Sequence, residues 1–148
     1  MVIETCRWTQ KQDIGPSPRA LFSMVYNSTS KNGVLFGGTD GVDTLNDTWE
    51  WEDEIWTQVA DMGPSIRAAH SMAYNSSSKK VILFGGADTT GSVFNDTWEY
   101  DGTEWTQVAD TGPTPRAFHR IIYNSDNDRI ILFGGRDNPT NMNDTWEW

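Results

Sequence analysis

The chain contains three copies of one pattern, and this repetition limits its fold more than any other feature of the sequence. Each copy has a Trp-Thr-Gln triplet, a Gly-Pro turn ending in arginine, a Tyr-Asn-Ser step, a glycine pair and an Asn-Asp-Thr-Trp-Glu segment. Corresponding residues lie 48 or 49 positions apart, as the triplets beginning at Trp8, Trp56 and Trp105 show. A period of this length indicates a repeat architecture in which each copy is one supersecondary unit.

The hydrophobic pattern of each copy predicts four short strands. In the second copy, Ala68–Tyr74 precedes a polar turn, and the continuous apolar run Val81–Phe84 is of the kind buried on both faces. Thr97–Tyr100 alternates between apolar and polar residues, and Trp105–Val108 follows an Asp-Gly turn. No segment shows helical periodicity. The sequence therefore predicts an all-β fold of four-stranded antiparallel sheets repeated around an axis, which is the plan of a β-propeller.

The order of these motifs resembles the kelch-repeat family. The resemblance is carried by the apolar strand ending in two glycines, the Asn-Asp-Thr-Trp segment, a later Trp and the Pro-x-x-Arg turn. It implies a single kelch-type unit over residues 1–148, with three four-stranded blades and repeats at about 8–55, 56–104 and 105–148. The short distance from Tyr100 to Trp105 predicts a tight hairpin between the third and fourth strands. Repeat one also departs from the pattern, because Phe22 stands where the other repeats have His70 and His119.

Three blades are fewer than the four to eight that usually close a propeller. The fourth strand of the split blade is expected at the N-terminus, so Trp8–Gln12 of one copy would pair with Asn143–Trp148 of another. This pairing predicts a homodimer with strand exchange at the termini and a closed six-bladed ring. A fragment of a longer natural propeller and an engineered propeller are the alternatives. The residues expected at ring closure are Trp8, Thr9, Gln10, Thr145, Trp146 and Trp148.

An arginine ends the turn before the first strand of each copy, and two interpretations of it stay open. The resemblance implies that this turn and the loop between the second and third strands open at the mouth of the central channel. The arginines either tie neighbouring blades together or form a ring of guanidinium groups that binds an anionic ligand or acidic peptide. The candidate ligand-binding residues are Arg19, Arg67, Arg116, His70, His119, Asp40, Asp88 and Asp137.

We expect no cofactor, no metal and no catalytic residue. Two histidines on separate blades are too few to hold zinc or copper, and the acidic loops match no dedicated calcium-loop spacing. Cys6 and its repeat counterpart Thr103 do not suit the cross-linked Cys–Tyr pair of kelch-type copper oxidases. The interpretation of the repeated aspartates is local turn capping or pairing with arginine.

Charge and hydropathy exclude several partners. The formal net charge is -10, and the sequence has no basic cluster, which argues against binding to nucleic acid or an anionic membrane surface. No apolar run reaches the length of a membrane span, and Met1 is not followed by a secretory signal pattern. The compartment is not assigned by these features, and a cytoplasmic location is the default expectation.

The resemblance implies a non-catalytic binding scaffold. Its partner would be a protein, a peptide or a small anionic ligand held at the channel mouth and the loops between the second and third strands, in addition to a second copy of the chain. One alternative is a carbohydrate-acting enzyme of the acidic-sugar mutarotase or epimerase type, with His70 or His119 as acid and base. Another is a purely structural or engineered fragment that self-assembles.

Overall fold

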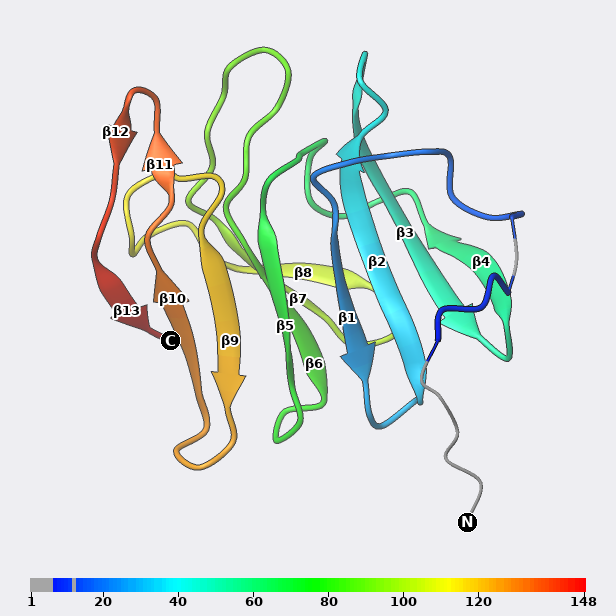
Figure 1. Cartoon of the computed structure of the whole chain (residues 1–148). Helices are drawn as coiled ribbons and strands as arrows, with labels where there is room; N and C mark the ends of the chain where they lie inside the picture. Colours follow the sequence, from blue (N-terminus) through cyan, green and yellow to red (C-terminus); the bar gives the residue numbers. More distant parts are fainter. Residues whose placement is uncertain (1–6, 12) are drawn as a thin grey trace.

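The protein is all-β, and its sheets stand side by side as blades (Figure 1). The structure, a computed structural model, describes residues 7–11 and 13–148. None of these residues lies in a helix, so the described part of the chain contains no helix able to span a membrane.

The first two blades are complete four-stranded antiparallel sheets whose strands follow chain order. Blade one contains β1 (Ser23–Asn27), β2 (Asn32–Thr39), β3 (Thr44–Glu52) and β4 (Ile55–Ala60). Blade two contains β5 (Ser71–Asn75), β6 (Lys80–Phe84), β7 (Thr97–Tyr100) and β8 (Trp105–Ala109). The expected kelch-type blades are confirmed.

Blade three has three strands within the described part of the chain. They are β9 (Arg120–Asn124), β10 (Arg129–Phe133) and β13 (Thr145–Glu147), in the order β13-β10-β9. A small hairpin of β11 (Arg136–Asp137) and β12 (Thr140–Asn141) lies in the loop between β10 and β13. No strand of the described residues lies beside β13 in the position that β4 and β8 hold in the other blades.

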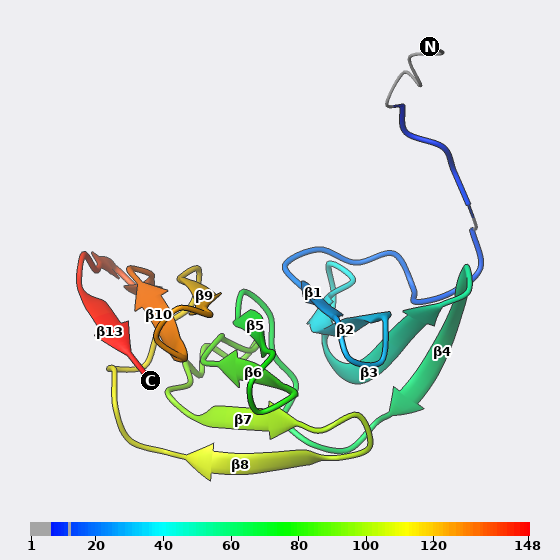
Figure 2. The same ribbon diagram turned by 90° about the horizontal axis from the view of Figure 1, so that it is seen from below.

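The three blades form an open arc (Figure 2). Their first strands, β1, β5 and β9, lie along one side of the arc, and β4 and β8 lie along the other. One apolar cluster joins blades one and two around Phe36, Leu83 and Trp105, and a second joins blades two and three around Phe84, Ile121 and Leu132. The core therefore lies between blades, since an isolated blade cannot bury its own faces.

The hairpin between the third and fourth strands is as tight as its spacing predicts. Glu52 pairs with Ile55, and the two residues between them, Asp53 and Glu54, have φ angles of 49° and 64°. Positive φ at both central residues is the geometry of a type I′ turn, which matches the twist of the flanking strands.

One expected strand boundary was wrong. The first strand of blade two begins at Ser71 and not at Ala68, because Ala69 has a φ of 56°, which no extended strand allows. Residues 7–11, which are expected to form a strand with a second copy, have no strand geometry in the single chain, and Trp8 is fully exposed. Gln12 and Cys6, which were expected in the same strand, lie outside the described residues. The pairing of this segment with a second copy stays a prediction.

Candidate functional site

An ion pair between a buried arginine side chain and a partly exposed aspartate joins the turn before the first strand of each blade to the start of its third strand. In blade two, Arg67 donates to both carboxylate oxygens of Asp96, at 2.6 and 2.9 Å. Its remaining N–H groups donate to the carbonyl oxygens of Ser65 and Gly85 and to the Ser65 hydroxyl. All five guanidinium donors are thus satisfied, and the side chain is almost wholly buried. The ring of Phe94 lies 4.3 Å from the guanidinium carbon and covers it.

The same pair recurs in the other two blades. Arg19 binds Asp47 and Arg116 binds Asp144, each through two hydrogen bonds of 2.6 and 2.9 Å. Burial raises the pKa of Asp96, but the hydrogen bonds and charge of Arg67, with the Trp98 indole, outweigh it and hold this pKa below its ordinary value. The hydrogen bond from Arg116 does the same for Asp144. Each pair is therefore ionised at neutral pH.

The backbone of the same arginine contacts the preceding blade. The Arg67 N–H donates to the Leu45 carbonyl of blade one at 3.0 Å, and its carbonyl accepts from the Gly38 N–H at 3.0 Å. Arg116 makes the same two bonds with Phe94 and Gly86 of blade two. One residue therefore holds its own blade with its side chain and the previous blade with its main chain. These contacts favour the interpretation that the arginines tie blades together; their role as ligand-binding residues stays a prediction.

Each residue of the Asn-Asp-Thr-Trp segment has a separate structural partner. In blade one, the Asn46 amide donates to the Asp61 carbonyl, and the Trp49 indole donates to Asp47. Thr48 accepts a 2.9 Å hydrogen bond from the indole of Trp105, which belongs to the next blade. The motif therefore forms hydrogen bonds within its own blade and also binds the fourth strand of the next blade.

His70 and His119 are buried at the two blade interfaces. Each ring packs edge-on against a phenylalanine of the preceding blade, Phe36 at 5.4 Å for His70 and Phe84 at 5.3 Å for His119. No hydrogen bond of ordinary geometry reaches their ring nitrogens from the described residues. Burial, with the nearby arginine charges, lowers the pKa of His70 to about 3 and that of His119 to about 4, although a weak interaction with the phenylalanine backbone acts in the opposite direction. Both rings are neutral at physiological pH.

The aspartates of the loops after the glycine pairs differ in their contacts. One carboxylate oxygen of Asp40 accepts from the N–H groups of Val42 and Asp43, and Asp88 accepts from Thr90 and Ser92 in the same way. These bonds lower the pKa of Asp40, whereas a hydrogen bond from the Thr90 hydroxyl, together with the N–H bonds, lowers that of Asp88. Asp137 is exposed and lies in β11. Turn capping is confirmed for the first two, and their role in ligand binding stays a prediction.

A groove at the mouth of the arc is formed by residues that sequence reasoning missed. Leu21, Ala69 and Phe118 occupy the same position in each repeat, just before Phe22 or the histidine, and all have φ between 56° and 61°. The Ala69 N–H donates to the Leu21 carbonyl at 2.7 Å, and the Phe118 N–H donates to the Ala69 carbonyl at 2.8 Å. This backbone chain links the blades and compensates for the left-handed conformation, which disfavours bulky residues. The shared position next to the histidine was the only signal in the sequence.

The groove is an open hollow between blades one and two, and Phe118, just before blade three, also lines it. Leu21 and Phe118 leave nearly half of their surface exposed beside it. Its other walls come from the segments after the glycine pairs and from the turn before β5. They include the side chains of Thr39, Thr44, Ala68, Ala87, Asp88 and Thr89.

The comparison with family models agrees with this geometry. Residues 50–148 match the model described as the KLHDC2/KLHL20/DRC7 Kelch-repeats domain, and this match covers most of the chain. The chain belongs to the kelch-repeat family. No curated protein matches it. The kelch match spans blades two and three, and blade one repeats their strand order and their arginine–aspartate pair. A β-propeller that acts as a binding scaffold is the general function that the kelch domain indicates.

Replacing Arg67 with alanine is expected to destabilise the kelch blades severely. The substitution leaves a mostly buried Asp96 carboxylate without its partner, and losing one member of a buried pair costs about 3–5 kcal/mol. The measurement is the free energy of unfolding in urea. The control is Lys11→Ala, which removes a solvent-exposed ion pair with Glu54 and should change this free energy by less than about 1 kcal/mol. Equal losses in the two variants would contradict the role assigned to Arg67.

The two histidines are expected to make the fold acid-sensitive well above the pKa of its carboxylates. Their pKa is lowered from 6.5 in the folded state, so the unfolded chain takes up protons first as the pH falls. Stability is complete above about pH 6.5, and by pH 5 it falls by up to about 2 kcal/mol per histidine.

The double variant His70→Phe/His119→Phe supplies the test, since Phe22 already occupies this position in repeat one. Its melting temperature should change much less than that of the wild type between pH 7 and pH 5. If the melting temperatures of the two proteins fell equally between pH 7 and pH 5, these histidines would not be the cause of the acid sensitivity.

Proposed function

We propose that this kelch propeller is a non-catalytic scaffold that binds a peptide segment of another protein at the channel mouth. The observation that carries the proposal is the groove lined by Leu21, Ala69 and Phe118. Loops on a rigid ring are the usual place for binding specificity, and the three loops after the glycine pairs differ most between the repeats.

The chemistry of the groove favours an apolar side chain flanked by a basic residue. Leu21 and Phe118 are exposed and apolar, whereas Asp40, Asp88 and Asp137 bring carboxylates to the surrounding loops. The guanidinium carbon of Arg136 lies 4.4 Å from the centroid of the Phe118 ring, so Arg136 covers one face of that ring. The net charge of -10 steers basic segments toward the protein and repels anions.

The alternatives receive less support from the site. A small anionic ligand would need guanidinium donors, but those of Arg67 and Arg116 are already engaged within the chain. An acidic-sugar enzyme would need an accessible acid or base with a pKa near neutrality, whereas His70 and His119 are buried and have lowered pKa values. A self-assembling structural module is the outcome if no peptide binds.

We also propose that a second copy completes the ring. Phe133 of blade three and Phe22 of blade one are both exposed, although their counterparts in the internal interfaces, Phe84 and His119, pack on each other. The two open faces are thus complementary halves of the same repeated interface. Closing it also removes an exposed apolar surface.

The mouth proposal predicts that Leu21→Ala/Phe118→Ala loses peptide binding. Peptides selected on the wild type from a phage-displayed random library should carry an apolar residue beside Lys or Arg, and they should bind the double variant at least tenfold more weakly. The control is Val108→Ala, which truncates a partly exposed apolar side chain on β8, away from the mouth. Peptides that bind all three proteins equally would overturn the proposed site, and the absence of any selected peptide would favour the structural module.

A further inference from the structure

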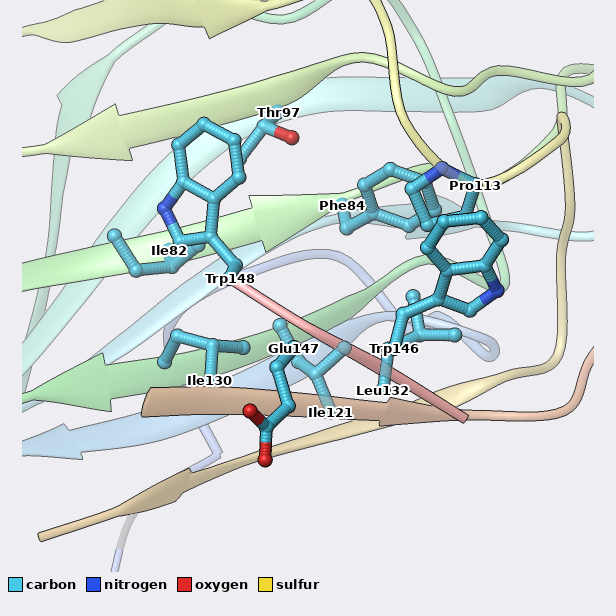
Figure 3. A pocket seen from close by; sticks show the side chains of 10 residues that line it. All are labelled: Ile82, Phe84, Thr97, Pro113, Ile121, Ile130, Leu132, Trp146, Glu147 and Trp148. Carbon is cyan, nitrogen blue, oxygen red and sulfur yellow. The ribbon is translucent and has the colours of Figure 1, made fainter. Parts of the chain in front are cut away.

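An apolar pocket on blade three reproduces, residue for residue, the surroundings of a buried tryptophan in the preceding blade. The pocket is open to solvent, and Figure 3 shows the side chains that line it. Trp146 and Trp148 lie on opposite sides of it in this view. Its other walls are Ile82, Phe84, Thr97, Pro113, Ile121, Ile130, Leu132 and Glu147.

The buried tryptophan is Trp105, the first residue of β8. Its ring centroid lies 5.2 Å from that of Phe36 and 5.1 Å from that of Tyr100, and its indole N–H donates to Thr48. One repeat further along the chain, the counterparts of these three residues are Phe84, Trp148 and Thr97, all of which line the pocket. The apolar residues that surround Trp105, namely Val34, Met72, Val81 and Leu83, likewise correspond to Ile82, Ile121, Ile130 and Leu132.

The glycine of the turn beside the pocket gives independent support for an indole site. A Cβ atom on Gly15 would lie 2.5 Å from Trp56, and one on Gly63 would lie 2.7 Å from Trp105. The third equivalent, Gly112, has no atom within 4 Å of the same position. Gly63 and Gly112 share the same φ of 135°, so the turn keeps the backbone shape that accommodates a tryptophan.

We propose that this pocket is an indole socket, filled by Trp8 from a second copy of the chain. This inference rests on the proposed ring closure and adds to it the residue that anchors the junction. Trp8 begins the same Trp-Thr-Gln triplet as Trp56 and Trp105, and its side chain is fully exposed. The other two triplet tryptophans are each packed against a glycine of this turn.

The register follows from blade two. There Tyr100 pairs with Trp105, Glu99 with Thr106 and Trp98 with Gln107. The same register places the partner's Trp8 opposite Trp148, its Thr9 opposite Glu147 and its Gln10 opposite Trp146. The indole N–H of the inserted Trp8 then donates to Thr97, as the Trp105 indole donates to Thr48.

An exposed ion pair links the described residues 7–11 to blade one. The Lys11 ammonium contacts Glu54 at 2.7 Å, but both side chains are more than half exposed. An ion pair in such a setting contributes little, so the segment can leave it for the socket.

The first test is the solution mass of the full chain with its variants. By light scattering, the wild type should have about twice 16.7 kDa. Trp8→Ala should weaken self-association at least tenfold, because large aromatic anchors dominate interfaces of this kind. Thr97→Val removes the indole acceptor and should weaken it by a smaller factor, whereas Val42→Ala, in an exposed loop of blade one, should not change it.

The second test identifies the socket itself. The ring current of an inserted indole shifts the methyl NMR signals of Ile82 and Ile130, so these signals should differ between the wild type and Trp8→Ala at concentrations where the wild type is dimeric. The methyl signal of Val42 should not change and serves as the reference.

The outcomes separate the two proposals. A wild-type dimer whose mass and methyl signals are unchanged by Trp8→Ala would overturn the socket and leave ring closure standing. A wild type that is monomeric at every concentration would overturn both the indole socket for Trp8 and the ring closure by a second copy. Peptide binding at the mouth is measured separately, so it is not decided by either result.

Discussion

The contacts between blades depend on the arginine that ends the turn before each first strand, and Arg67 and Arg116 each bond to two blades at once. Taking a guanidinium and a carboxylate out of water is costly, and their attraction offsets that cost only when every donor is satisfied. Arg67 meets this condition, because its five donors all have acceptors and Asp96 also accepts from the Trp98 indole. The pair therefore contributes a defined geometry more than a large net stability. Its main consequence is that the backbone on either side of Arg67 lies where the preceding blade can bond to it.

This arrangement makes each blade dependent on its neighbours. In the middle blade, Val81, Ile82, Leu83 and Phe84 of β6 are all buried, because apolar surface covers both faces of the sheet. In blade three, Phe133 is the counterpart of Phe84 and is 58% exposed. The difference comes from the missing neighbour and not from the residue itself. Stability in such a structure is a sum of blade and junction contributions, so a free junction is a site at which a partner gains binding energy.

The repeat period and the apolar pattern were enough to predict the blades. Val81–Phe84 and Thr97–Tyr100 are strands as expected, because burial on two faces and alternation are local properties of the sequence. The channel mouth could not be predicted in this way. Its residues, such as Leu21 and Phe118, are placed by positive φ angles and by hydrogen bonds between blades, and hydrophobic periodicity carries no information about either. The arginines were located correctly, but sequence alone left two roles open, and the side-chain contacts now favour one of them.

The departure of repeat one from the pattern has a physical consequence at the open junction. Inside the chain, Phe36 meets His70 and Phe84 meets His119, and each neutral histidine must stay unprotonated to remain buried. At a junction between two copies, Phe133 would meet Phe22, whose side chain has no titratable group. When a histidine at an internal interface becomes protonated, the covalent chain still connects the two blades. An interface between separate copies has no such connection. In the proposed dimer, phenylalanine at this position would therefore make the junction between copies the one that acid affects least.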